Sequence, residues 1–166
     1  MLDQKKNIIL IIIFFIILLS IISALIIEHA LGHQPCSLCL YERIPYFLSA
    51  LLIIKIFFFK KYEKITLLIL FLVFMTSALL AFYHFGIEQG FFDESFVCNV
   101  ESQLKILSKE NLLKELNKNI VSCKDVTFRI LGLSLAGMNT ILSVVLSIIF
   151  LKLFFNYGSS STSQYK

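Results

Sequence analysis

Long apolar runs separated by short polar segments make up most of this chain. Four runs are long enough to cross a bilayer as helices, because a hydrocarbon core of about 30 Å needs roughly 20 residues at 1.5 Å each. They cover residues 8–27, 42–59, 65–85 and 130–155. Lys55 and Lys152 lie late in their runs, from where a long side chain reaches the surface. The pattern predicts an all-α membrane protein, a four-transmembrane-helix antiparallel bundle formed as one domain by residues 1–155.

Composition supports this class, since 58% of the residues are hydrophobic and only 16% are charged, which is too apolar for a soluble domain. The first span also resembles a signal peptide, because a basic segment precedes it. Its apolar run is about twice the usual length of a signal sequence, and no small-x-small cleavage site follows. We therefore expect a retained span, and either interpretation leaves the next loop outside the cytoplasm.

The lysines predict the orientation of the bundle. They precede the first span, crowd the link between the second and third, and follow the fourth: Lys5, Lys6, Lys60, Lys61, Lys64, Lys152 and Lys166. The positive-inside rule places these regions, with both termini, in the cytoplasm. The loops at 28–41 and 86–129 have no basic excess, and we expect both to be periplasmic. This asymmetry explains the net charge of +4 without a nucleic-acid partner. The polar tail, 156–166, is expected to be disordered and cytoplasmic.

All four cysteines fall in the two outer loops, at Cys36, Cys39, Cys98 and Cys123. An even number of cysteines in an oxidising compartment favours disulfides over a metal site. A structural bridge fits Cys98 and Cys123 well enough. A ring closed between Cys36 and Cys39 removes little chain entropy and is readily reduced, which indicates a redox role. The spacing matches neither a haem attachment signature nor a four-thiolate zinc site, so we expect no metal.

The residues around this dithiol suggest how it is activated. Pro35 suits the first turn of a helix, where the helix dipole would favour a thiolate at Cys36. If the helix continues, Arg43 shares a face with Cys39 and would stabilise a thiolate there and negative charge on a quinone oxygen. Anchoring at the interface, or a pair with Glu42, explains Arg43 equally well. Pro45 either kinks this helix or starts it anew.

Two segments resemble the bacterial DsbB-type proteins of the inner membrane. They are Pro35–Arg43, in which Cys-x-x-Cys is followed at once by x-Tyr-Glu-Arg, and Phe128–Ser134 shortly after Cys123. The resemblance covers about residues 8–155. It implies a quinone-dependent protein thiol-disulfide oxidoreductase that re-oxidises a periplasmic DsbA-like thioredoxin-fold protein. The cofactor would be ubiquinone or menaquinone, which would accept the electrons. Re-oxidation of the partner would sustain disulfide bond formation.

Site roles follow from the same resemblance. Cys36 and Cys39 correspond to the redox pair beside the quinone, and Arg43 to the arginine implicated in quinone binding. Cys98 corresponds to the cysteine that forms the mixed disulfide with the partner, and Cys123 to the one that exchanges with Cys36. The chain departs from the best-known members in the segment Tyr83–Gly90 and in lacking Trp, which indicates a different branch.

Several side chains keep two interpretations. His84, and with it Glu88, is a candidate for assisting quinone protonation, although a histidine at an interface is more often a boundary residue. Asn139 is a candidate interhelical hydrogen bonder. Residues 101–121 carry an imperfect helical stripe, expected as a helix on the outer membrane surface or packed on its own loop. For the whole chain, the alternative function is a non-enzymatic membrane assembly or carrier subunit whose disulfides are only structural.

Overall fold

The computed structural model describes residues 2–93, 98, 122–124, 129–130 and 132–162. Its long helices are α1 (Leu2–His29), α3 (Ile44–Phe58), α4 (Glu63–Glu88) and α7 (Leu135–Thr162). Shorter elements are α2 (Ser37–Tyr41), the 3-10 helix η1 (Lys60–Tyr62) and the strands β1 (Arg129–Ile130) and β2 (Leu133–Ser134). Four helical segments are long and apolar enough to span a membrane. The predicted all-α, four-helix membrane bundle is confirmed.

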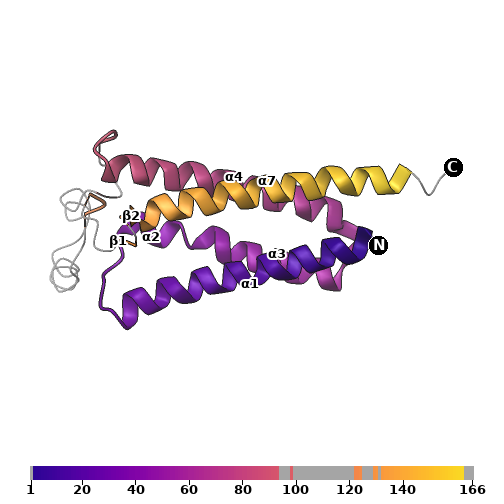
Figure 1. The fold of residues 1–166 in the computed structure, drawn as a ribbon, viewed down its shortest axis with the longest axis horizontal. Helices are drawn as coiled ribbons and strands as arrows, with labels where there is room; N and C mark the ends of the chain where they lie inside the picture. The colour runs from indigo at the N-terminus through magenta and orange to yellow at the C-terminus, as the bar shows by residue number, and fades with distance from the viewer. Residues whose placement is uncertain (1, 94–97, 99–121, 125–128, 131, 163–166) are drawn as a thin grey trace, which may run out of the picture.

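Successive long helices run in opposite directions (Figure 1). The end of α1, the helix α2, both strands and the start of α7 lie at one end of the bundle, which we call the loop end. The start of α1 and the end of α7 lie at the other end. The two loops that carry the cysteines therefore reach the same end of the molecule, as the predicted topology requires.

Small side chains on α7 allow α4 to pack closely along it. Ala136, Ser143 and Ser147 are buried on this face. At Gly137, an added Cβ would lie 3.3 Å from the ring of Phe85, so the missing side chain lets α4 approach. Deeper in the bundle, Phe74 of α4 stacks on Phe150 of α7 with ring centroids 5.6 Å apart. Large apolar side chains cover the outside of the bundle, as expected for a surface that faces lipid.

The second span is interrupted between the short helix α2 and the long helix α3. The helix α2 ends at Tyr41, α3 begins at Ile44, and Pro45 lies in the first turn of α3. Of the two expectations for Pro45, a new helix start is therefore correct. Pro35 lies outside α2 and not in its first turn, because Cys36 is the N-cap and its sulfur accepts the Cys39 N–H.

The fourth span also begins later than residue 130. Strands β1 and β2 pair antiparallel, with Arg129 opposite Ser134. Gly132 forms the turn with φ +84°, a conformation that glycine adopts without steric cost. The Ser134 hydroxyl accepts the Gly137 N–H at 3.2 Å and caps the new helix. The hairpin thus replaces the first turn that the apolar pattern suggested.

The tail prediction is wrong for residues 156–162, which continue α7 as far as Thr162. Extending an existing helix adds one backbone hydrogen bond for each residue ordered, so a polar segment can follow an apolar helix at little cost. Residues 163–166, and the helix expected at 101–121, lie outside the described residues.

Phe74→Ala tests the packing of the bundle. Phe74 is fully buried between Phe150 and the edge of the Tyr46 ring. We expect a loss of about 3 kcal/mol in unfolding free energy, the low end for this substitution because lipid is itself apolar. Reversible unfolding in mixed micelles measures it. Phe82→Ala on the same helix is the control, since Phe82 is 56% exposed; equal losses for the two variants would contradict the packing described.

Candidate functional site

All four cysteines meet at the loop end of the bundle. Cys98 and Cys123 form a disulfide, and both are buried. They share one apolar cluster with Cys36, Leu38 and Ile87, and Cys39 packs against it. Two cysteine pairs that are far apart in sequence therefore pack in one cluster.

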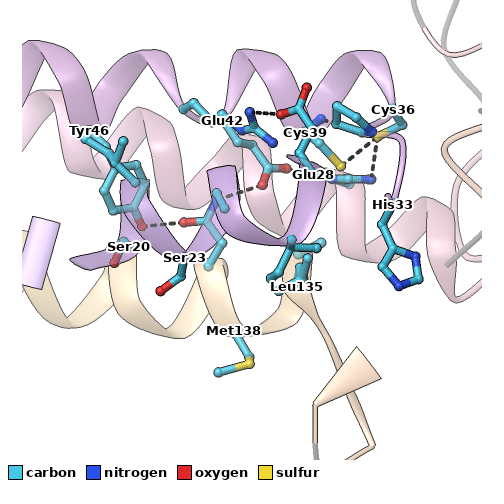
Figure 2. Close-up of a pocket in the computed structure, with 18 of the residues that line it drawn as sticks. Ser20, Ser23, Glu28, His33, Cys36, Cys39, Glu42, Tyr46, Leu135 and Met138 are labelled. Carbon is cyan, nitrogen blue, oxygen red and sulfur yellow. Dashed lines mark hydrogen bonds and ion pairs between the residues drawn. The ribbon is translucent and has the colours of Figure 1, made fainter. Parts of the chain in front are cut away.

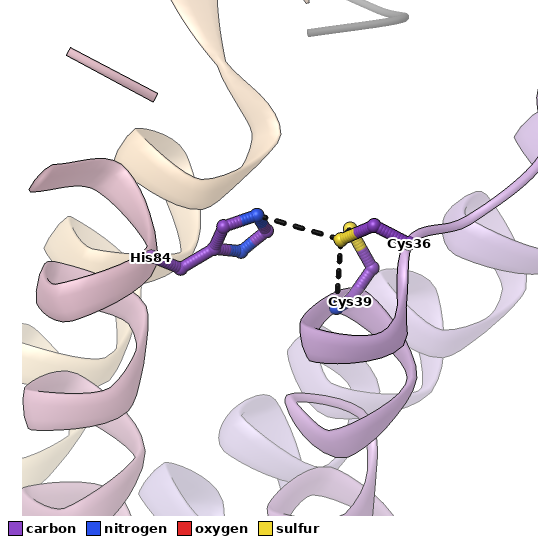
Figure 3. A group of neighbouring side chains, drawn as sticks. All are labelled: Cys36, Cys39 and His84. Carbon is purple, nitrogen blue, oxygen red and sulfur yellow. Dashed lines mark hydrogen bonds between the residues drawn. The ribbon is translucent and has the colours of Figure 1, made fainter. Parts of the chain in front are cut away.

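Cys36 and Cys39 are free thiols with their sulfur atoms 2.9 Å apart. The capping turn of α2 holds them together, since the Cys39 N–H donates to the Cys36 sulfur at 3.3 Å. His84 reaches across from α4 and places its Nε2 3.5 Å from the Cys36 sulfur (Figure 3). A base thus contacts one particular thiol of the pair.

Glu42 fixes the orientation of His84. The imidazole Nδ1 lies 2.7 Å from Glu42 Oε1, and both side chains are buried. A carboxylate only accepts hydrogen bonds when ionised, so Nδ1 carries the proton and Nε2 is the nitrogen free to exchange one with sulfur. The arrangement has the logic of a nucleophile, a base and an orienting acid.

A chain of hydrogen bonds continues from Glu42 into the bundle. Asn139 of α7 donates its Nδ2–H to Glu42 Oε2 at 2.7 Å. Its Oδ1 accepts from the Tyr46 hydroxyl and from Ser143 Oγ, the latter at 3.3 Å. Figure 2 shows Glu42 between Tyr46 on one side and Cys36 on the other. The expectation that Asn139 hydrogen bonds between helices is confirmed.

Arg43 pairs with a residue that sequence reasoning missed. Its Nη1 donates to Glu28 Oε2 near the end of α1. The alternative prediction, an ion pair between Arg43 and Glu42, is wrong. The break between α2 and α3 leaves Glu42 facing His84 instead. Arg43 nevertheless lines the same cavity as both thiols, with its charge partly offset by Glu28.

A cavity of about 470 Å³ opens beside these groups. Polar and charged side chains line it, among them Arg43, His84, Glu88 and Asn139, together with apolar side chains of α1 and α7, among them Leu19, Ile27, Met138 and Leu142. Glu88 is buried, its Oε1 lies 3.8 Å from His84 Nε2, and its Oε2 has no hydrogen-bond partner in the described part of the chain. Two carboxylates, Glu42 and Glu88, therefore flank His84 at this wall of the cavity.

The surroundings of Cys36 favour its thiolate. The hydrogen bond from the Cys39 thiol lowers the pKa of Cys36 most, and the hydrogen bond and charge of His84 lower it further against the opposing effect of burial. Together they bring the pKa of Cys36 from 9.0 to about 4. The sequence suggested that Arg43 would activate Cys39. In the structure the nearest activating group is His84, and it contacts Cys36.

The remaining histidines lie apart from this contact. His29 bonds its own helix through Leu25 O, and His33 lines the cavity. The three groups Cys36, Cys39 and His84 lie close enough for a metal to bridge them by distance alone. We do not assign them as metal ligands, because hydrogen bonds already join Cys39 to Cys36, Cys36 to His84, and His84 to Glu42.

Comparison with known proteins assigns the family. The family described as "Disulfide bond formation protein DsbB" matches residues 6–153. The chain belongs to the DsbB family. It is also 30% identical over 146 residues to the uncharacterized protein RP370 of Rickettsia prowazekii (strain Madrid E), an alignment that covers 86% of this chain and 83% of that protein. No solved structure matches the chain.

The match to the DsbB family includes every group described above, from Glu28 to Asn139. Membership identifies the chain as a multi-pass membrane protein of disulfide bond formation, which agrees with four spanning helices and a thiol pair beside a disulfide. Glu42 and Glu28 are the site residues that sequence reasoning underestimated. The available signal was the presence of carboxylates at the ends of apolar runs, where an unpaired charge is costly.

The pH dependence of Cys36 alkylation tests the thiol geometry. With its pKa lowered to about 4, Cys36 stays a thiolate at neutral pH, so its reaction with iodoacetamide should be nearly independent of pH between about 6 and 8. His84→Ala removes the opposite charge and should move the midpoint up by at least about one unit. Peptide mass spectrometry of the reduced protein measures both, with His29→Ala as the matched control. A wild-type rate that climbs tenfold per pH unit over this range would contradict the geometry.

Proposed function

We propose that this DsbB-family protein is a quinone-dependent thiol-disulfide oxidoreductase of the bacterial inner membrane. It re-oxidises a periplasmic DsbA-like thioredoxin-fold protein and passes the electrons to a membrane quinone. The observation that carries this proposal is the meeting of both cysteine pairs at the rim of a cavity that also contains Arg43 and His84. In this proposal the loop end faces the periplasm and the termini face the cytoplasm.

The outer disulfide receives electrons from the partner. A thiolate of the partner attacks Cys98, the bond to Cys123 breaks, and the second partner thiol then releases Cys98 as the partner's own disulfide closes. Cys123, which shares the cluster with Cys36 and also lines the cavity, then attacks Cys36 and releases Cys39 from a Cys36–Cys39 disulfide. The Cys98 thiolate attacks Cys123 in turn, which re-forms the outer disulfide and releases Cys36. Cys98 is only 2% exposed, so the loop must open for the partner to reach it.

The cavity has the features that a quinone ring needs. Its volume of about 470 Å³ lies within the usual range for small-molecule sites, and its apolar walls suit a ring with a hydrocarbon tail. Arg43 supplies a charged hydrogen-bond donor for a carbonyl oxygen in this cavity. A bound quinone would contribute an acceptor for two electrons and two protons.

The chain's own residues prepare those electrons and protons. Before the disulfide closes, Cys36 is held as a thiolate with its proton on His84 Nε2, and Cys39 keeps its thiol proton. Formation of the Cys36–Cys39 bond releases two electrons, and the two protons come from His84 and Cys39. Glu42 keeps the imidazole oriented throughout, and Arg43 stabilises negative charge that develops in the cavity.

Cys39→Ser tests the relay. Without a second sulfur the inner disulfide cannot close, so quinol production from the reduced partner should fall to the level measured without protein. Absorbance of the quinone follows the reaction in detergent, and an intact Cys98–Cys123 disulfide shows that the variant is folded. Unchanged quinol production would exclude this function and favour a membrane subunit with structural disulfides only.

Arg43→Gln tests quinone recognition separately. Removing a charge-assisted hydrogen bond costs about 1.5 kcal/mol or more, so the quinone KM should rise about tenfold while the partner's KM changes little. Lys55→Gln, which removes a cation from the exposed side of the same helix, is the control. Equal effects of the two variants on the quinone KM would count against a place for Arg43 at the ring.

A further inference from the structure

We propose that Asn139 and Tyr46 are positioning residues for the thiol site, because they hold Glu42 in the orientation that sets His84 against Cys36. The inference rests on the proposed function for its purpose, but its geometry stands alone. It gives α7, which contributes no cysteine, a defined role in thiol chemistry at the loop end.

Only one orientation of the Asn139 amide suits all of its hydrogen-bond partners. Tyr46 donates its hydroxyl proton to Asn139 Oδ1, and Ser143 Oγ donates to the same oxygen at 3.3 Å. The amide nitrogen of Asn139 is then left to donate to Glu42 Oε2 at 2.7 Å. A flipped amide would set its oxygen against the carboxylate, two acceptors facing each other. The hydroxyls of Tyr46 and Ser143 therefore fix which way Asn139 points.

Burial makes this orientation matter. Glu42 is 7% exposed, Tyr46 is 5% exposed and Ser143 is fully buried, so water does not replace a lost partner easily. Glu42 Oε1 is used by His84 and Oε2 by Asn139, so both carboxylate oxygens are committed. Without Asn139 the carboxylate would turn to seek another donor, and Arg43, already paired with Glu28, lies next to it in the chain.

Few charged groups surround His84. The hydrogen bonding that α7 supplies can therefore be tested separately from the charges at the site. Cys36 and Cys39 face it from the start of α2, Glu42 and Arg43 come from the break before α3, and Glu88 comes from α4 itself. From α1, Glu28 acts through its pair with Arg43. Among the described residues that line this cavity, α7 adds no charge. Substitution of Asn139 thus changes hydrogen bonding without changing the number of charges at the site.

The test is the pH profile of Cys36 alkylation in the purified, fully reduced, full-length protein, read by peptide mass spectrometry. Asn139→Leu keeps the approximate side-chain size and removes all three hydrogen bonds, to Glu42 and from Tyr46 and Ser143. Loosening Glu42 weakens the hold on protonated His84, so the thiolate of Cys36 is less favoured and its midpoint should move up by about one unit. Tyr46→Phe keeps the ring and should give a smaller shift in the same direction, because Ser143 still holds the amide.

Ser147→Ala is the matched control, since Ser147 lies one turn beyond Ser143 on α7 and contacts Met75 instead of Asn139. It should leave the profile unchanged. A double-mutant cycle makes the test specific: in a Glu42→Leu background, Asn139→Leu should add no further shift, because the acceptor of the Asn139 hydrogen bond is gone. Gel filtration in detergent shows whether each variant is folded, and Tyr46→Phe decides the matter if Asn139→Leu is not.

An unshifted profile in folded Asn139→Leu and Tyr46→Phe would overturn the inference. So would an equal shift from Asn139→Leu with and without Glu42. The alkylation assay needs neither quinone nor partner. Its failure is therefore distinct from failure of the proposed function, which would show as an absence of quinol production by the unaltered protein.

Discussion

The pairing of one buried carboxylate organises the loop end of this protein. Glu42 lies at the point where α2 gives way to α3, and in apolar surroundings its charge is tolerated only with strong hydrogen-bond partners. His84 of α4 and Asn139 of α7 are those partners. Their contacts draw three helices together at the same level, and the imidazole that results lies against the Cys36 sulfur.

This constraint gives the two faces of the thiol pair different surroundings. Toward the loops, Cys36 packs with the Cys98–Cys123 disulfide in one apolar cluster. Toward the bundle, both thiols line a cavity with apolar walls and a cation at its rim. Thiol exchange and transfer to a lipid-soluble acceptor need those two environments respectively, and α2 is short enough for its first turn to contact both.

Sequence reasoning recovered what depends on local pattern. Runs of apolar residues predicted the four helices, and the motif that ends at Arg43 predicted the family. The redox role expected of Cys36 and Cys39 stays a prediction. Sequence reasoning did not recover contacts between helices, which depend on how each helix is rotated about its axis and how far it is shifted along the bundle. His84 is 48 residues from Cys36, and its role was left open because an interfacial histidine alone has no directional signal. Arg43 and Glu28 meet only because the chain breaks before α3. The polar residues after 155 looked like a tail, but helix propagation overrides that composition as far as Thr162.

An anaerobic titration measures directly whether Cys36 and Cys39 pass their electrons to a quinone. A variant with Cys98→Ser and Cys123→Ser, fully reduced and held in lipid nanodiscs, is mixed with increasing quinone, while absorbance counts quinol and peptide mass spectrometry counts closed Cys36–Cys39 disulfides. The account predicts that quinol and this disulfide appear together, one for one, with Cys36 and Cys39 oxidised in the same chains. Thiols that remain reduced in the presence of excess quinone would contradict it.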